Sequence, residues 1–583
     1  MTVTLRAMKN LDRLFAAYAS GISGRPIFRW LSIGLIGLLA TTIAIRPQTG
    51  TSPTAKPQAV AADPNAACAA CHRQIYDRYR TTPMANASGP ATDGLVPGEF
   101  HHKPSGVYYR VFQQGSEAWL SYERDDSASD RKLSGQQKLQ YFIGSGKRGR
   151  TYLFQQQGYW FEAPINWYGK QQLWDMAPNY LAAKSMPLTL PVDPGCLACH
   201  TSGVAQSLPD ARNHYAAAPF ANGGITCTSC HGDTTDHITT SGKAKLANID
   251  SMEPVRRDSV CLACHLEGQA SVLRFGKERS AFRPGDNLFD YELFFVRSDE
   301  KGSGGRATSQ FEALLKSECK RKSGDKLTCT TCHDPHGSPP AAERVAFYRQ
   351  KCLQCHNQQG FAETHHPENP DCASCHMARP PSNDIAHEQV TDHWIKKRVS
   401  QDRLPLATTG DLIPVGGMIA GDRDLGLAYA QMAARGDQQA GEKAVQFLRR
   451  TEKQSIGAPT DHELHAQLGF LDQLAGKTQD AAEEYRKALV ADPFDSLAAG
   501  NLALIEAQQH HYPEAIRLWT QVFNHDPVQI DAGLNLAIVQ CGVGQRDTTL
   551  ATLNRVLAFS PDNDRARTMM AAIRSGRQTC EAK

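Results

Sequence analysis

The stretch CLACHTSGV at residues 196–204 and the stretch CLACHLEGQ at residues 261–269 open with the same five letters. Both follow the pattern Cys-x-x-Cys-His. Seven copies of this pattern use 14 of the 17 cysteines and leave Cys319, Cys541 and Cys580 over. A pattern repeated this often decides how the central part of the chain folds. The other copies are CAACH at 68–72, CTSCH at 227–231, CTTCH at 329–333, CLQCH at 352–356 and CASCH at 372–376.

Two cysteines at this spacing can form thioether bonds to the two vinyl groups of one haem, and the adjacent histidine can then reach the iron. The sequence therefore predicts seven haem c groups. The predicted thioether residues are Cys68, Cys71, Cys196, Cys199, Cys227, Cys230, Cys261, Cys264, Cys329, Cys332, Cys352, Cys355, Cys372 and Cys375. The predicted proximal iron ligands are His72, His200, His231, His265, His333, His356 and His376.

Three other uses of paired cysteines fit the sequence less well. Zinc sites also use Cys-x-x-Cys units, but zinc does not require a histidine after every second cysteine. Adjacent Cys-x-x-Cys pairs are poor structural disulfides, although an exported chain could carry a disulfide framework. A thioredoxin-like redox motif would occur once, between a strand and a helix, rather than seven times.

Four stretches around the motifs resemble the multihaem cytochrome c superfamily that includes the octahaem hydroxylamine oxidoreductases and the pentahaem nitrite reductases. The chain is more closely similar to exported cytochromes that join such a domain to tetratricopeptide repeats. The resemblance covers residues 62–397 and the repeats, and it implies electron transfer outside the cytoplasm. The stretches are GITCTSCHGDTTDH at 224–237, LTCTTCHDPHG at 327–337, HHPENPDCASCHM at 365–377 and AHEQVTDHW at 386–394.

Electron-carrying haems bind a second axial ligand on the iron, and histidines outside the motifs are the candidates. Met84 competes with them at the first haem, whereas Met377 is too close to His376 to reach around the iron. His365 and His366 both precede the seventh motif, and we assign the second of them. The candidate distal ligands are His102, His214, His237, His336, His366, His387 and His393.

Candidate ligands are numerous enough to fill all seven sites, which favours an electron carrier without substrate turnover. The nitrite reductases commonly carry a Cys-x-x-Cys-Lys motif, and this chain has none. One rival hypothesis is a redox enzyme that acts on a small nitrogen or sulfur compound at one five-coordinate haem. Another is an assembly scaffold in which the repeats carry the main function. A count of high-spin haem separates the carrier from the enzyme.

The N-terminus is typical of an export signal. Residues 1–29 contain several arginines and would stay in the cytoplasm, and the apolar segment 30–45, WLSIGLIGLLATTIAI, follows. This segment predicts either an uncleaved inner-membrane anchor or a cleaved signal, before a linker at 46–62. The protein would then be periplasmic or otherwise extracytoplasmic. A net charge of only +3, without a long Lys/Arg block, argues against nucleic acid as a partner.

The central domain is predicted over residues 63–400, and it contains two inserts. Residues 100–174 include GVYYRVFQ and AWLSYER, whose aromatic and β-branched residues predict a small antiparallel β insert. Residues 266–326 are predicted to be mostly loop with one helix. A Pro- and Gly-containing linker at 401–424 leads out of the domain. Redox proteins that give and accept electrons are its predicted partners.

Residues 425–577 are predicted to form a repeat domain, and residues 462–563 within it carry an internal repeat with a period of 34. Three repeats keep a small residue, a large residue and a closing proline in register, which resembles the tetratricopeptide repeat. The predicted fold class is thus mixed: a loop- and helix-rich multihaem domain with a β insert, then an all-α solenoid. We expect the repeats to fold independently and to bind a protein partner. We expect Cys319 to be a buried inert thiol, Cys541 a core residue and Cys580 part of a frayed tail. The proline positions are Pro493, Pro527 and Pro561, and the large residues are Tyr485, Trp519 and Leu553.

Overall fold

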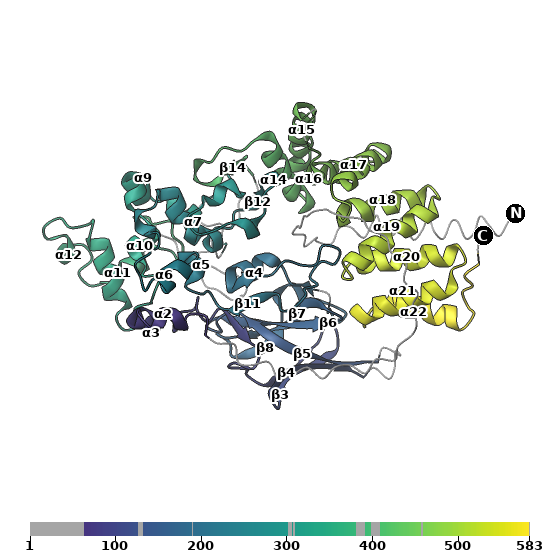
Figure 1. Cartoon of the computed structure of the whole chain (residues 1–583), viewed down its shortest axis with the longest axis horizontal. Coiled ribbons are helices and arrows are strands. Elements are labelled where there is room, and N and C mark those ends of the chain that lie inside the picture. The colour runs from purple at the N-terminus through teal and green to yellow at the C-terminus, as the bar shows by residue number, and fades with distance from the viewer. Residues whose placement is uncertain are drawn as a thin grey trace.

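The computed structural model describes residues 63–125, 132–188, 190–300, 306, 309–379, 391–397, 409–455, 457 and 459–581. They form a strand-rich lobe, a helix-and-loop region that carries the seven motifs, and an arc of paired helices (Figure 1). The predicted mixed fold class is confirmed. The expected segments 1–29, 30–45 and 46–62 lie outside the described residues. Among the residues that are described, no helix is long and apolar enough to cross a membrane.

The β insert is a nine-stranded antiparallel sheet. Its main path runs β2-β3-β4-β5-β6-β7-β8, while β1 pairs with β5 and β9 pairs with β7. Aromatic side chains, including Tyr109, Tyr152 and Phe154, fill its buried face. The strands are β1 (Ser88–Pro90), β2 (Gly98–His102), β3 (Val107–Gln114), β4 (Glu117–Arg124), β5 (Leu133–Ile143), β6 (Gly149–Gln156), β7 (Tyr159–Tyr168), β8 (Leu173–Met176) and β9 (Leu190–Pro191).

The motif region consists of short helices joined by loops. Asp193, Thr328 and Asp371 each cap a motif helix by accepting a backbone N–H, which fixes where that helix begins. The helices are α2 (Ala66–Ala69), α3 (Arg73–Tyr79), α4 (Pro194–His200), α5 (Thr228–His231), α6 (Thr235–Thr239), α7 (Pro254–His265), α8 (Gln310–Leu315), α9 (Glu318–Ser323), α10 (Cys329–Cys332), α11 (Arg344–Leu353), α12 (Phe361–Thr364) and α13 (Cys372–His376). A two-stranded sheet of β10 (Thr201–Val204) and β11 (Phe220–Gly223) follows the second motif.

The expectation of mostly loop with one helix for residues 266–326 misses two strands and a second helix. These residues supply β12 (Ala270–Leu273) and β13 (Glu292–Arg297), which form a three-stranded sheet with the distant β14 (Leu412–Pro414), as well as α8 and α9. Every residue of β13 is buried, so the strand lacks the alternation that identifies a half-exposed strand. Its second neighbour comes from more than 100 residues away, which local sequence cannot reveal.

The repeats form antiparallel helix pairs. Helices α16, α18 and α20 begin at residues 462, 496 and 530, and so keep the period of 34. Ala481 and Tyr485 are fully buried where paired helices meet, as are their repeat equivalents. The helices are α14 (Asp422–Ala434), α15 (Gln438–Gln454), α16 (His462–Leu474), α17 (Thr478–Ala491), α18 (Ser496–Gln508), α19 (Tyr512–His525), α20 (Ile530–Gly542), α21 (Arg546–Phe559) and α22 (Asp564–Arg574).

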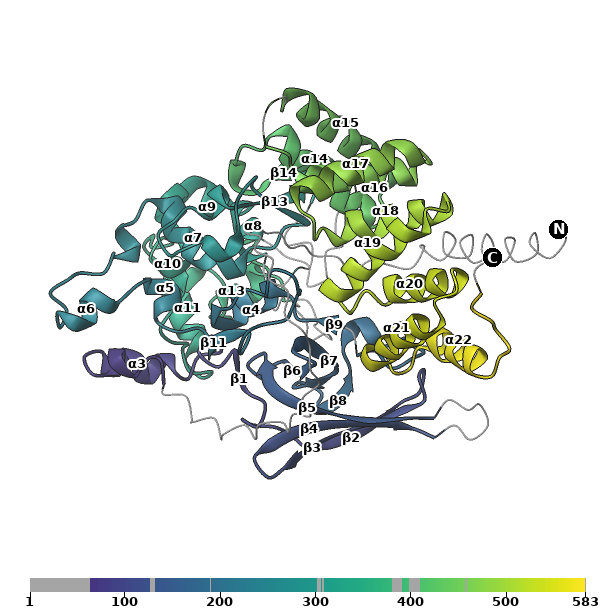
Figure 2. The same cartoon turned by 45° about the vertical axis from the view of Figure 1, so that its right-hand side comes forward.

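The repeats do not form the independent unit that we expected. Helix α14 packs on β12 and shares one core with Leu262, a residue inside the fourth motif. At the other end, Phe559 belongs to the core of the large sheet. Figure 2 shows the arc reaching from one sheet to the other. The reason is that the two ends of the arc carry apolar side chains. Those of α14 pack against the three-stranded sheet, and Phe559 of α21 packs against the nine-stranded sheet.

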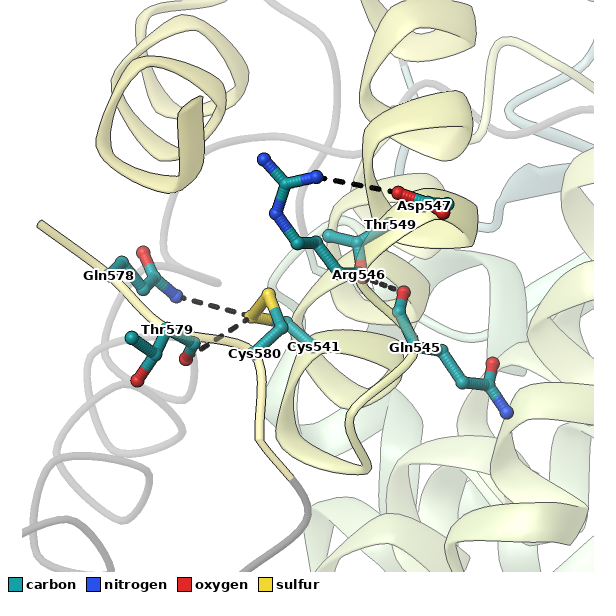
Figure 3. Close-up of a disulfide and its surroundings, with 8 residues drawn as sticks. All are labelled: Cys541, Gln545, Arg546, Asp547, Thr549, Gln578, Thr579 and Cys580. Atoms are coloured by element: carbon teal, nitrogen blue, oxygen red, sulfur yellow. Dashed lines mark hydrogen bonds and ion pairs between the residues drawn. A yellow bond between two sulfur atoms is a disulfide. The ribbon is translucent and has the colours of Figure 1, made fainter. Parts of the chain in front are cut away.

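A disulfide joins Cys541 on α20 to Cys580 in the C-terminal tail (Figure 3). Cys541 is buried, as expected, but Cys580 does not lie in a loose tail. The bond encloses α21 and α22 and holds the chain end against the solenoid. The two residues are 39 positions apart, and neither belongs to a repeated cysteine pattern, so the sequence gives no sign of the pairing.

Candidate functional site

A cavity of about 3020 Å³ runs through the motif region, and residues of all seven motifs line it. The second motif reaches it through Cys199, and the seventh through Cys372 and His376. In the other five motifs, both cysteines and the histidine face the cavity. Positions i and i+3 of a helix lie on one face, so the two thiols of a motif can point to the same side. The cavity is large enough to hold several flat apolar groups side by side.

Four motif histidines face a second histidine across this cavity. The ring centroids of His72 and His237 are 6.2 Å apart, and the ring planes are inclined by 15°. The equivalent values are 5.9 Å and 2° for His231 and His336, 6.2 Å and 36° for His333 and His393, and 5.9 Å and 18° for His376 and His365. The members of each pair come from different elements, so the tertiary fold brings them together.

These separations suit two imidazoles that bind one metal ion from opposite sides. A bond from a metal ion to an imidazole nitrogen is about 2 Å long, and each ring centroid lies about 1 Å behind its nitrogen, so about 6 Å is required. Rings in direct stacking contact would be closer than this. The residues of the four pairs therefore fit a haem iron between them.

Hydrogen bonds leave Nε2 available on several of these histidines. Nδ1 of His376 donates to the carbonyl of Lys396 at 2.6 Å, and Nδ1 of His237 donates to the carbonyl of Ala244 at 2.8 Å. Nδ1 of His393 contacts the carbonyl of Thr391 at 3.1 Å. Such partners fix the tautomer and the ring orientation of metal-binding histidines. Sequence reasoning missed these carbonyls because backbone acceptors leave no residue-type signal.

Three of the candidate distal ligands do not face a motif histidine. Both ring nitrogens of His102 are engaged, with the Ser105 hydroxyl at 2.8 Å and the Leu181 carbonyl at 3.2 Å. His214 packs edge-on against Tyr159, outside the cavity.

His366 is exposed, and its neighbour His365 faces His376 instead. The reason is that adjacent side chains point to different sides, and the sequence offered no means to choose between them. His387 lies outside the described residues.

The two CLACH motifs pack against each other. The thiol of Cys199 contacts the carbonyl of Ala263 at 3.8 Å, and the thiol of Cys264 contacts the carbonyl of Ala198 at 3.9 Å. The contact is reciprocal because the second cysteine of each motif lies against the small alanine of the other motif. Leu197 and Leu262, at the same position of the two motifs, are both buried. The two motifs thus have the same five residues because they occupy equivalent positions in one contact between two helices.

Cysteines of different motifs lie beside one another in a defined order. Cys227 lies beside Cys68, Cys261 beside Cys329, and Cys264 beside Cys199. Cys352 lies beside Cys372 and near Cys332. Cys230 is close to both cysteines of the fourth motif. The motifs therefore form a series, first to third to fourth to fifth to sixth to seventh, and the second motif branches from the fourth.

Burial favours the neutral form of several cavity histidines. Burial lowers the pKa of His231, His265 and His333 below the usual range. Burial and then the neighbouring His333 lower the pKa of His393 to about 4. Neutral imidazole is the form that binds a metal ion, so these groups need not release a proton first.

Cys319 lies on the cavity wall, close to Cys332 and Cys355. Burial raises the pKa of its thiol, which keeps it protonated at neutral pH. It is partly buried, so the expectation of a buried inert thiol holds only for part of its surface. The reason is that its helix, α9, borders the cavity rather than a packed core.

Two family models match parts of the chain. One is described as "Doubled CXXCH motif" and matches residues 321–361, and the other is described as "Cytochrome c554 and c-prime" and matches residues 170–232. No curated protein sequence matches the chain.

Among solved structures, the chain is similar to MamA AMB-1, with 21% identity over 27% of this chain and 82% of that one and a TM-score of 0.24. It is also similar to a tetratricopeptide repeat protein from Parabacteroides merdae, with 16% identity over 25% of this chain and 58% of that one and a TM-score of 0.23. The motifs and the two family models together support a multihaem cytochrome c region that binds haem c, ahead of an all-α repeat region.

Proposed function

We propose that this chain is an extracytoplasmic c-type cytochrome that carries electrons along seven covalently bound haems. The observation that carries the proposal is the set of four facing histidine pairs, because two axial histidines are typical of low-spin electron-carrying haem. The Cys541–Cys580 disulfide supports a location outside the cytoplasm, where disulfides persist. When bound, the haems would supply one-electron chemistry, and the facing histidines would serve as their axial ligands.

The neighbouring motif cysteines support a route for the electrons. Haems attached at adjacent cysteines lie close together, so the series of motifs becomes a series of haems with the second as a branch. Both ends of the series are open to solvent: Cys71 in the first motif, and Cys352, Cys355 and Cys375 in the last two, are exposed. We infer that a donor and an acceptor protein exchange electrons at these ends.

Two measurements on the intact protein test this function. The mass must equal that of the polypeptide plus seven haems, and a stable species with fewer haems contradicts the count. Electron paramagnetic resonance of the oxidised protein should then show low-spin iron at the four paired sites. A spectrum dominated by high-spin iron contradicts the carrier.

A second candidate function, redox catalysis at one five-coordinate haem, has a specific observation in its favour. Within the described ranges, no second histidine ring faces His265 or His356; Gln310 hydrogen-bonds the former, and Phe361 lies 5.5 Å from the latter. His387 is a candidate ligand for one of these sites. A high-spin signal that small nitrogen or sulfur oxyanions alter would favour this enzyme over the carrier.

We also propose that the repeats bind a protein partner. Apolar side chains remain exposed on them, including Leu474 at 57% and Val490 at 79% of their full areas. Because α14 shares a core with the fourth motif, such a partner would dock on a surface that is rigidly joined to the haem cavity. Surface substitutions test this proposal better than deletion of the repeats. Such a deletion would expose the core that α14 shares with the fourth motif.

A further inference from the structure

The histidine of the fifth motif is held by a tyrosine side chain. Nδ1 of His333 contacts the hydroxyl of Tyr348 at 3.3 Å. The hydrogen-bonded Nδ1 atoms of His376, His237 and His393 instead face backbone carbonyls. When Nε2 binds a metal, Nδ1 carries the proton and donates it to this partner, so His333 donates to a phenol oxygen.

The same site differs in its ring geometry. The planes of His333 and His393 are inclined by 36°, whereas the other three facing pairs are inclined by 2° to 18°. The hydrogen bond at Nδ1 sets the rotation of a ring about its Cβ–Cγ bond. A different partner on one ring therefore accounts for a different angle between the two.

Ring contacts hold Tyr348 beside His333. Its ring meets the His333 ring edge-on, with centroids 5.7 Å apart and an angle of 70°. It also packs edge-on against Phe347 and borders the cavity. Tyr348 lies within α11, which ends beside Cys352 of the sixth motif. One helix thus positions a ligand of the fifth haem and attaches the sixth.

We propose that Tyr348 is a positioning residue that sets the ring orientation of His333 and, as a hydrogen-bond acceptor, lowers the reduction potential of the fifth haem. By accepting the Nδ1 hydrogen, a phenol oxygen makes the imidazole more electron-rich, although less so than an amide carbonyl would. A more basic axial ligand stabilises the oxidised iron more, which disfavours the reduced form. This inference rests on the proposed function, because it requires His333 and His393 to bind one iron.

The test is Tyr348→Phe in the full holoprotein, examined by spectroelectrochemical titration and electron paramagnetic resonance. The phenylalanine ring keeps the packing but removes the acceptor, so one reduction wave should move to higher potential. The signal of one low-spin haem should also change, since it depends on the angle between the axial rings. Tyr76→Phe is the matched control: Tyr76 also lines the cavity, but its hydroxyl bonds Asp63 and no motif histidine.

A Tyr348→Phe protein whose waves and signals equal those of Tyr76→Phe overturns the inference. A parallel His393→Ala variant separates this failure from failure of the proposed function. If His393→Ala makes one haem high-spin while Tyr348→Phe changes nothing, only the role of Tyr348 is wrong. If neither variant alters any haem, the ligand pair itself is wrong.

Discussion

The imidazole rings of His231 and His336 face each other with their centroids 5.9 Å apart and their planes inclined by only 2°. His231 ends the third motif, and His336 follows the fifth, so the pair joins two motifs that are about 100 residues apart. On the proposed function, we infer that His336 binds the iron of the third haem rather than that of the nearer fifth motif.

We expect His336→Ala to convert one haem from low-spin to high-spin or water-bound iron without loss of covalent haem. The reason is that the alanine removes an axial ligand but leaves both thioether bonds intact. Visible and electron paramagnetic resonance spectra measure the change, and intact mass confirms that the haem remains. His366→Ala is the control, since its side chain is exposed, and it should leave the spectra unchanged. An unchanged spectrum in His336→Ala would remove this ligand assignment.

We expect Arg124→Ala to destabilise the protein strongly. Nη1 of Arg124 donates to Asp562 at 2.9 Å across the contact between the large sheet and the last repeat, and both side chains are buried. Removal of one partner from a buried ion pair costs up to about 3–5 kcal/mol. The cost here should lie below that limit, because Asp562 keeps its bonds from Arg567 and from the backbone N–H of Met186. Denaturant unfolding followed by circular dichroism measures this loss.

The control for that experiment is Arg73→Ala, which removes an exposed ion pair with Asp77. Exposed pairs contribute little, so its unfolding midpoint should match that of the parent protein. Equal midpoints for the two variants would show that the sheet and the repeats are not held together through Asp562.

We expect the repeats to lose stability in acid through Glu484. Burial works to raise the pKa of this carboxyl, but hydrogen bonds from His465, Arg449 and Lys487 outweigh it and hold the pKa at about 2. A lowered pKa means that the stabilisation is complete above the usual range for glutamate and disappears as the pH falls toward 2.

Glu484→Gln should therefore be less stable than the parent at pH 7, and the difference should shrink by pH 2–3. Unfolding curves at both pH values measure the difference, and Glu483→Gln, on the exposed side of the same helix, is the control. A difference that stays constant with pH would contradict the ionic contribution of Glu484.

We expect Val490→Asp combined with Leu474→Asp to abolish complex formation with a partner of the repeats. Both side chains are exposed, so charge there should not disturb the fold, and the haem spectra should stay the same. Co-purification with the redox partner measures the loss. Ile413→Asp is the control, because it places a charge on an exposed apolar residue of β14, away from the repeats. Binding that survives the double substitution would move the docking surface elsewhere.

Short-range patterns in the sequence predict the local features of this protein. The spacing within each Cys-x-x-Cys-His motif is a property of five consecutive residues, so it predicts haem attachment without any knowledge of the fold. The period of 34 likewise predicted the helix pairs, because each repeat places its small and large residues by local helix geometry. The strands of the β insert were visible because their aromatic and β-branched residues are grouped between turns.

Which residues meet across the cavity depends on the tertiary structure. The candidate distal ligand His237 lies on the short helix α6, and the candidate His393 lies in a loop. Their positions depend on long-range packing, and no local pattern distinguishes them from His102 or His366. The same holds for β13, whose neighbour β14 is remote in sequence, and for the union of the repeats with both sheets. Five consecutive residues are enough to attach a haem, so the sequence can predict attachment. The second axial ligand comes from a residue that only the tertiary fold brings near, so the sequence could not predict it.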